Sequence, residues 1–176
     1  MWRISQRLFL GDYTSGMLAL EGARQPVDPS GAMEPFAGIV SMCRMPLTPS
    51  DQQLVPCQRE TEWLKIPILD GGEGEGELES ALSVARPFVA RRRQQGNVLV
   101  HCAAGMSRSV ALVAALLCDE GETVAGALDR IAEAKAAALQ PFLGDPADLV
   151  CPAAEFRACL NRLYGRRQND TKRDNT

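Results

Sequence analysis

Hydrophobic residues in this chain fall into two patterns that alternate along its length. Short apolar runs bounded by glycine, proline or charge predict β-strands, and longer stretches with apolar residues three or four positions apart predict α-helices. The predicted strands cover residues 7–10, 38–43, 63–69 and 97–100. The predicted helices cover residues 12–23, 78–95, 107–120, 123–138 and 152–163. This alternation predicts an α/β fold, with a central, mainly parallel sheet of about four to five strands flanked by helices.

Proline positions refine these boundaries. Residues 25–36 and 44–60 are broken by prolines and predict loops. Pro67 predicts a sheet edge or a strand end, because proline cannot donate to a strand ladder. Pro87 predicts a kink or a break in its helix. Pro152 suits the first residue of the last helix, where the missing N–H has no partner to lose.

The length of 176 residues and the hydrophobic fraction of 45% fit one domain with a substantial core. We predict that this single domain spans residues 1–164. Residues 165–176 contain four basic residues, two aspartates and no apolar side chain, which predicts a flexible polar tail. The body without that tail is more acidic than the whole chain, whose net charge is −3.

The composition excludes several classes of function. A single histidine rules out sites that need two, such as that of an HExxH zinc protease. Six cysteines without a CxxC pair indicate neither a zinc site nor a disulfide framework. We therefore expect no metal and no other cofactor. The acidic balance argues against nucleic-acid binding, which favours a basic face.

The apolar pattern also lacks membrane and secretion signals. The longest apolar run, at residues 110–118, has nine residues, whereas roughly 20 are needed to span a bilayer. The first 13 residues contain no apolar core of the kind that a secretory signal needs. We expect a cytoplasmic protein with no membrane partner, in which the cysteines stay reduced.

One stretch, VLVHCAAGMSRS at residues 98–109, carries a specific chemistry. A buried strand runs into Cys102, and a loop leads from it to Arg108 at the start of an apolar helix. In such a loop successive N–H groups can point inward beside a helix N-terminus, which makes a site for an anion. Arg108 would close the ring with a guanidinium, the side chain best shaped for two contacts to a phosphate. The predicted phosphate-binding residues are Ala103, Ala104, Gly105, Met106, Ser107 and Arg108.

Cys102 is the predicted nucleophile of this loop. A helix N-terminus and a cationic neighbour lower the pKa of a thiol and favour the reactive thiolate. Ser109 can donate a hydrogen bond to the sulfur and so help it leave from a phosphocysteine. Gly105 gives the tight turn its backbone freedom, and His101 is expected to support the loop and the thiolate without transferring protons. No GxxxxGK[ST] nucleotide loop occurs in the chain, which favours binding a phosphate in order to remove it.

The motif formed by His101-Cys102, five further residues and Arg108-Ser109 resembles the signature of the cysteine-dependent protein tyrosine phosphatase superfamily. HCAAGMSRS is similar to the HCxAGxSRS version found in dual-specificity phosphatases, and the resemblance extends over about residues 4–163. It implies a protein tyrosine phosphatase-like fold and a general acid, an aspartate on an upstream loop. Asp70 matches that position, 32 residues before Cys102. A carboxylic acid there would protonate the leaving oxygen, a contribution of roughly 10²–10⁴-fold.

Two segments depart from the family pattern. Residues 71–79 alternate glycine with glutamate and have no assigned family role, and Glu73 or Glu75 could serve as the acid in place of the aspartate. Residues 134–151 are longer than the usual connection to the last helix and predict a partner surface or an insertion. The other cysteines predict plain reduced thiols, although one of them could pair with an oxidised Cys102.

These features predict a phosphomonoester hydrolase that works through a phosphocysteine intermediate. By resemblance its substrate would be phosphotyrosine and phosphoserine or phosphothreonine in proteins, so the expected partner is a phosphorylated protein. One alternative keeps the chemistry and changes the substrate to a phosphoinositide, a phosphoglucan or an RNA 5′-phosphate. The neutral loop residues Ala103, Ala104 and Met106 disfavour that alternative. A second alternative is a phospho-binding module with little activity, and a third, a sulfurtransferase, has no use for Arg108 and Asp70.

Overall fold

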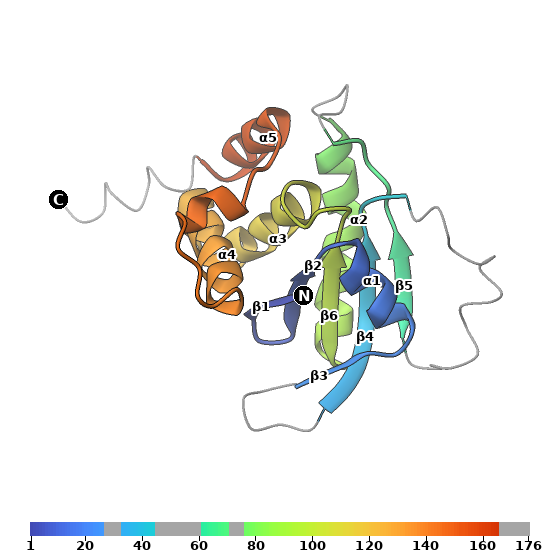
Figure 1. The fold of residues 1–176 in the computed structure, drawn as a ribbon. Helices are drawn as coiled ribbons and strands as arrows, with labels where there is room; N and C mark the ends of the chain where they lie inside the picture. Colours follow the sequence, from blue (N-terminus) through green and yellow to red (C-terminus); the bar gives the residue numbers. More distant parts are fainter. Residues whose placement is uncertain (27–32, 45–60, 71–75, 166–176) are drawn as a thin grey trace.

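The computed structural model describes residues 1–26, 33–44, 61–70 and 76–165, which build an α/β fold around one six-stranded sheet (Figure 1). The strands are β1 (Trp2–Ser5), β2 (Leu8–Gly11), β3 (Arg24–Pro26), β4 (Met33–Ser41), β5 (Glu62–Lys65) and β6 (Asn97–His101). The helices are α1 (Tyr13–Leu20), α2 (Gly76–Arg93), α3 (Arg108–Asp119), α4 (Val124–Ala138) and α5 (Ala154–Tyr164), with a 3-10 turn η1 (Pro146–Leu149) before α5. The predicted fold class is confirmed.

The sheet is mixed, and its parallel part lies in the centre. The strand order is β1-β2-β6-β4-β3, and β5 also pairs with β4. β6 is parallel to β2 and β4, and β4 is parallel to β5, whereas β1 and β3 add antiparallel pairings with β2 and β4. The two extra strands raise the strand count above the predicted four to five, because segments this short carry no recognisable alternation.

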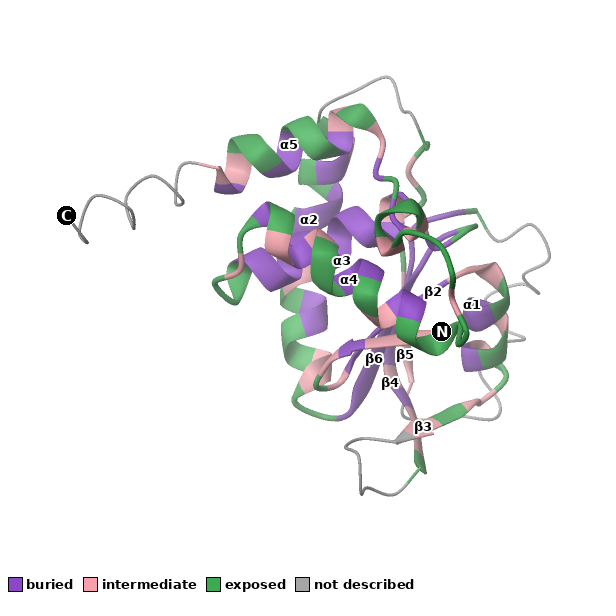
Figure 2. Ribbon diagram, turned by 60° about the vertical axis from the view of Figure 1, so that its left-hand side comes forward, coloured by how far each residue is buried: buried purple, intermediate pink, exposed green. Residues whose placement is uncertain are grey.

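Side chains alternate between the two faces of the sheet and fix where the helices lie. Phe9, Ile39 and Leu99 form one cluster with Ala19 of α1. The neighbouring strand residues, such as Val98 and Val100, belong to the larger core that includes α2 and α3. This period of two is what a sheet covered on both faces requires. Figure 2 shows the result, with buried residues concentrated in the strands and in α3.

Several element boundaries differ from the sequence predictions. β4 begins at Met33, inside a stretch predicted to be loop, because pairing with β3 extends it beyond its apolar part. α5 begins at Ala154 with Ala153 at its N-cap, so Pro152 precedes the helix rather than opening it.

The two internal prolines behave differently from each other. β5 ends at Lys65, so the strand end expected near Pro67 is confirmed, but the strand covers Glu62–Lys65 rather than the predicted 63–69. α2 continues through Pro87 from Gly76 to Arg93, so a break there is wrong. The burial of Phe88 and Val89 against the core offsets the lost helix hydrogen bond.

Some predictions concern residues outside the described ranges. These residues are the loop at 45–60, which contains Cys57, and the tail from residue 166 onward. Glu73 and Glu75, the alternative acids, also lie outside the described ranges. Within the described ranges, no helix has both the length and the apolar character needed to cross a membrane.

Candidate active site

The carboxyl ends of the parallel strands gather the residues of the candidate site. Asp12 follows β2, Cys43 lies just beyond β4, and Cys102 follows β6. The segment after β5 leads to Asp70. The crevice outside the carboxyl ends of strands is where open α/β sheets bind ligands.

Cys102 lies at the start of the loop between β6 and α3 and is buried, with 1% of its surface exposed. The hydroxyl of Ser109, in the first turn of α3, donates a hydrogen bond to its Sγ over 3.1 Å. Burial raises the pKa of Cys102. Hydrogen bonds from the hydroxyl and amide of Ser109 and from the amide of Gly105, together with the charge of Arg108, outweigh burial and lower that pKa below its ordinary value. The arrangement favours the thiolate.

Arg108 and Asp70 face each other beside the loop. The Arg108 guanidinium donates to the carbonyl of Ile68 over 3.2 Å, and its Nη2 lies 3.4 Å from a carboxylate oxygen of Asp70. The other carboxylate oxygen of Asp70 accepts a hydrogen bond from the hydroxyl of Ser107. The buried Nε of Arg108 finds no acceptor among the described residues. The Nε and Nη2 of this guanidinium can bind a tetrahedral oxyanion as a pair once the Asp70 carboxylate gives up its contact with Nη2.

His101 is fully buried on the other side of the sheet end. Its Nε2 lies 2.6 Å from the hydroxyl of Ser41, which also accepts the indole N–H of Trp63 over 2.8 Å. Burial lowers the pKa of His101 to about 4, against weaker opposing effects of the Cys102 backbone and the charge of Asp12. The ring is therefore neutral at physiological pH, and its Nε2 is engaged with the Ser41 hydroxyl.

Metal ligands do not gather here. Within the described ranges, no group of three or more histidine, cysteine, aspartate or glutamate side chains is arranged to hold a metal ion. The five described cysteines are free thiols, at positions 43, 102, 118, 151 and 159.

Comparison with protein-family profiles matches residues 42–143 to "Dual specificity phosphatase, catalytic domain". The matched region contains Asp70, Cys102, Arg108 and Ser109. The chain belongs to the dual specificity phosphatase family. Membership supports phosphatase activity based on a cysteine. No match was found among curated proteins.

Solved structures share the fold of this dual specificity phosphatase domain. Human DUSP28 is 21% identical, with 97% of this chain and 99% of that chain covered and a TM-score of 0.61. A leucine rich repeat and phosphatase domain containing protein from Entamoeba histolytica is 15% identical, with coverage of 97% and 93% and a TM-score of 0.60. The human tyrosine phosphatase-like serine/threonine/tyrosine-interacting protein is 20% identical, with coverage of 93% and 94% and a TM-score of 0.56. At these identities the likeness concerns the fold.

The structure brings the predicted residues of the phosphatase site together. Cys102, Arg108 and Ser109 lie on one loop and the helix that follows it, and Asp70 reaches that loop from the segment after β5. Gly105 has a φ of +68°, and a Cβ there would stand 2.8 Å from the Trp2 ring. The expected need for glycine at this turn is confirmed.

Sequence reasoning missed the residues that support the loop from behind. Lys135 of α4 is 2% exposed and donates from Nζ to the carbonyl of Gly105 over 2.8 Å. The amide of Cys151, which follows η1, donates to the carbonyl of Met106 over 2.8 Å. The signal for Lys135 was present, because it continues the apolar stripe of α4 through Ala127 and Ile131, where a charged residue is unexpected.

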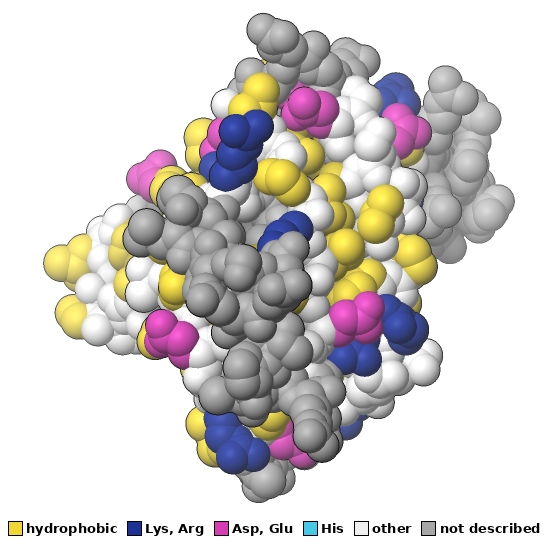
Figure 3. Space-filling model, turned by 90° about the vertical axis from the view of Figure 1, so that its right-hand side faces the viewer, with side chains coloured by type: hydrophobic (Ala, Val, Ile, Leu, Met, Phe, Trp, Pro, Cys, Tyr) yellow, Lys and Arg dark blue, Asp and Glu magenta, His cyan; other side chains and the backbone are white. Residues whose placement is uncertain are grey.

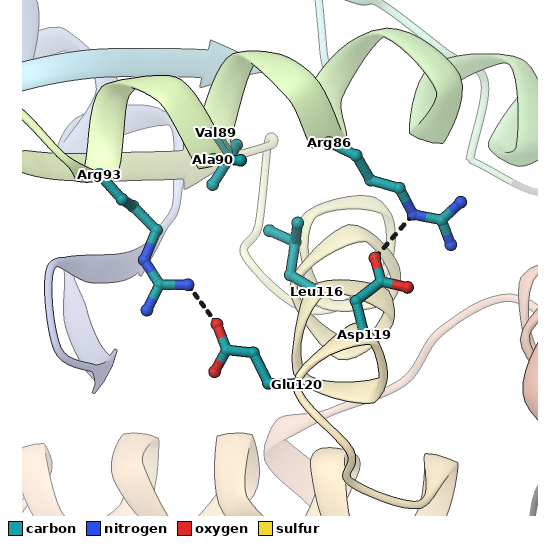
Figure 4. Close-up of a pocket in the computed structure, with 7 residues that line it drawn as sticks. All are labelled: Arg86, Val89, Ala90, Arg93, Leu116, Asp119 and Glu120. Carbon is teal, nitrogen blue, oxygen red and sulfur yellow. Dashed lines mark hydrogen bonds and ion pairs between the residues drawn. The ribbon is translucent and has the colours of Figure 1, made fainter.

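A hollow of about 220 Å³ lies between α2 and α3, at the end of α3 remote from the loop. Its charged lining residues are already paired: Arg86 with Asp119 over 2.8 Å, and Arg93 with Glu120 (Figure 4). These contacts hold the two helices together, and each charged residue described in this lining already has a partner of opposite charge.

A larger, open hollow of about 610 Å³ lies nearer the loop. Figure 3 looks at the side of the molecule that carries β5, where hydrophobic side chains gather. The hollow is lined by Ile66, Pro67, Ile68, Gly76, Glu77, Ser80, Ala81 and Val84. Ile68 connects this hollow to the candidate active site, because its carbonyl also accepts the hydrogen bond from Arg108.

Proposed function

We propose that this protein is a cytoplasmic phosphomonoester hydrolase that acts on phosphotyrosine and phosphoserine or phosphothreonine in proteins. The observation that carries the proposal is the convergence of Cys102, Arg108, Ser109 and Asp70 at the end of β6. A nucleophile, an oxyanion-binding fork, a hydroxyl that stabilises the leaving thiolate and a carboxyl group are what two-step phosphoryl transfer needs.

In the first step, the Cys102 thiolate attacks phosphorus and forms the S–P bond while the P–O bond to the leaving group breaks. The Nε and Nη2 of Arg108 and the loop amides hold the non-bridging oxygens. Asp70 gives its proton to the departing oxygen, so that an alcohol leaves.

In the second step, a water molecule attacks phosphorus and gives a proton to the Asp70 carboxylate. The S–P bond breaks, and Cys102 leaves as a thiolate that accepts a hydrogen bond from Ser109. Inorganic phosphate is released, and the carboxyl group has regained its proton for the next turnover.

The hollow beside Ile68 favours a protein substrate over the alternatives. Its lining is mainly apolar, and no lysine or arginine belongs to it among the residues that the structure describes. A phosphoinositide headgroup or an RNA end brings several charges that need basic partners. A peptide that flanks a phosphorylated residue can place an apolar side chain there instead.

The nucleophile is tested by hydrolysis of an aryl phosphate with EDTA present. We expect wild-type protein to turn over without metal and Cys102→Ser to lose more than roughly 10³-fold in kcat. Cys118→Ala is the matched control, since it removes another buried thiol at the far end of α3. A wild-type rate from Cys102→Ser would show that the thiol is not the nucleophile.

The general acid is tested with two leaving groups. Asp70→Asn should lose more activity with an alkyl phosphate than with an activated aryl phosphate, because only the alkoxide needs a proton to leave. Glu79→Gln is the control: it neutralises a carboxylate at the start of the following helix, where the exposed Glu79 pairs with Arg162 over 2.9 Å. Equal losses with both leaving groups would remove Asp70 from this role, and Glu73→Gln and Glu75→Gln would then be compared in the same assay.

The substrate class is tested with a panel of phosphopeptides, phosphoinositides and 5′-phosphorylated RNA. We expect the highest kcat/KM with phosphopeptides. Val84→Glu, which places a charge in the hollow, should lower kcat/KM for phosphopeptides and not for p-nitrophenyl phosphate. Leu18→Glu on α1 is the control because its exposure of 47% matches the 50% of Val84. A preference for lipid or RNA phosphates would overturn the protein assignment.

A further inference from the structure

Lys135 is a buried cation whose contacts all lead to the back of the phosphate-binding loop. Its Nζ donates to the carbonyls of Gly105 and Leu149 and lies 4.6 Å from the centre of the Trp2 ring. An ammonium has three N–H donors, and these three partners account for them. None of the ion pairs between described side chains includes Lys135.

A lysine buried without a carboxylate is costly to the fold. Burial lowers the pKa of Lys135, and only the more distant Cys102 and Asp12 oppose that effect. An apolar side chain of similar length would fill the same space beside Trp2 without that cost. Packing alone therefore does not explain why a charge occupies this position.

Peptide geometry explains what the contact with Gly105 does. In a trans peptide unit the C=O and the following N–H point in opposite directions. Because Lys135 holds the carbonyl of Gly105 outward, the N–H of Met106 must point to the opposite side, toward the anion site. This contact fixes the backbone at Gly105, whose φ is +68°. A glycine has no side chain that would restrict its backbone conformation, so an outside contact has to do so.

Two other contacts act on the loop in the same way. The amide of Tyr13 donates to the carbonyl of Ala103 over 3.0 Å, and the amide of Cys151 donates to the carbonyl of Met106 over 2.8 Å. These two donors are backbone amides, one at the first residue of α1 and the other in the segment after η1. Lys135 is the side-chain member of the set, and through Leu149 it also ties η1 to the loop.

We infer that Lys135 is a positioning residue: its ammonium holds the loop from behind in the conformation whose amides face the bound phosphate. It touches neither the substrate nor the reacting atoms. The same ammonium adds positive charge behind the anion site, which strengthens attraction for phosphate. This gives a role to the unusual segment at 134–151 as a brace for the loop. The inference rests on the proposed function for its catalytic consequence.

The test measures the affinity for inorganic phosphate together with kcat and KM for an aryl phosphate. We expect Lys135→Met to bind phosphate roughly 10-fold more weakly and to lose roughly 10–100-fold in kcat, because small errors in placing oxyanion donors are expensive. Lys135→Arg, which keeps the charge and can donate to both carbonyls, should recover most of both losses. Arg130→Met is the matched control: it removes a positive charge from the same helix, where the exposed Arg130 pairs with Glu122.

The outcomes separate positioning from a purely structural role. Phosphate affinity equal to wild type in folded Lys135→Met, whatever its melting temperature, would overturn the inference. If Lys135→Met does not fold, Lys135→Gln and Lys135→Arg decide it: the ordering wild type, Arg, Gln in phosphate affinity supports positioning, and equal affinities contradict it. If the wild type hydrolyses nothing, the proposed function fails, while the phosphate affinities still test Lys135.

Discussion

His101 carries a titratable ring into the interior without a charged partner. The ring is fully buried, its Nε2 contacts the Ser41 hydroxyl, and burial lowers its pKa to about 4. A neutral imidazole can stay there because the ring is small and one of its nitrogens is hydrogen-bonded. The fold therefore depends on keeping this side chain unprotonated.

Stability should fall as the solution becomes acidic because of His101. The unfolded histidine binds a proton as the pH drops through 6.5, whereas the folded one stays neutral down to about 4. Between those values the unfolded state holds more protons, so stability present above pH 6.5 is lost progressively toward pH 4. The loss from this group should be about 2 kcal/mol at pH 5. Urea unfolding at pH 7.5 and pH 5 measures it, and His101→Asn should show a smaller difference. An equal difference in both proteins would contradict the assignment.

Gly16 is required by the same ring. A Cβ at Gly16 of α1 would lie 2.2–2.5 Å from three atoms of the His101 imidazole. Gly16→Ala should destabilise the protein by about 1–3 kcal/mol, since the ring is held by Ser41 and cannot yield. Gly76→Ala in α2 meets nothing within 4 Å and should be neutral or stabilising. Thermal unfolding compares the two, and a tolerated Gly16→Ala would mean that the ring can move.

At the scale of elements, the sequence predicted most of the framework. The strands that became β2, β4, β5 and β6 and the helices that became α1 to α5 have strong local patterns, so the sequence predicted that they exist. β1 and β3 were not, because four- and three-residue strands are defined by the partner they pair with. The break predicted as one possibility at Pro87 is wrong for a related reason: burial of the helix outweighs the local cost of the proline, which sequence alone makes look decisive.

The residues of the candidate site also fall into those that the sequence predicted and those that it did not. Cys102, Arg108 and Ser109 are seven residues apart at most, so their spacing described one loop and one helix start. Asp70 was reached only by family resemblance. Lys135 and Trp2 come to the loop from α4 and β1, over a separation that no local pattern measures. What the sequence left out is therefore the support of the site rather than its reactive groups.

Tyr164 joins three helices and offers a test at this scale. Its hydroxyl donates to Asp119 of α3 over 2.9 Å and accepts a hydrogen bond from Arg86 of α2. Tyr164→Phe should lower the free energy of unfolding by about 1–2 kcal/mol, because Asp119 and Arg86 then lose a partly buried partner. Tyr13→Phe is the control, since the buried hydroxyl of Tyr13 has no partner among the described residues. Urea unfolding that ranks Tyr13→Phe as the more damaging change would contradict this account.

At the scale of the whole molecule, the net charge repels a phosphate, whereas the residues that the fold gathers at the candidate site attract it. The chain carries a net charge of −3, yet the carboxyl ends of its parallel strands surround a site built from Arg108, loop amides and the buried Lys135. A phosphate therefore approaches a molecule that is acidic at long range and attractive only near the loop. The repulsion from the net charge acts over a longer distance than the attraction near the loop, and dissolved salt screens the long-range repulsion first.

The salt dependence of catalysis should reveal this difference. Raising the ionic strength from about 0.02 M to about 0.15 M shortens the screening length to roughly 8 Å. We expect kcat/KM for a phosphopeptide with acidic flanking residues to rise relative to that for a peptide with basic flanking residues of equal length. Stopped assays of both peptides at matched pH measure the ratio. A ratio that falls with salt would mean that the region around the site is basic at long range as well.

The contact between Asp70 and Arg108 has a consequence for turnover. In the absence of substrate the guanidinium already has an anion of its own, so phosphate binding is an exchange of one oxyanion for another. The exchange weakens the affinity for substrate, but it weakens the affinity for product by the same amount. In the proposed reaction Asp70 is protonated when inorganic phosphate forms. Once Asp70 loses that proton, its carboxylate competes with phosphate for Arg108, and because it is covalently attached it is always present at high local concentration. The carboxylate of Asp70 would in this way help to release inorganic phosphate from Arg108.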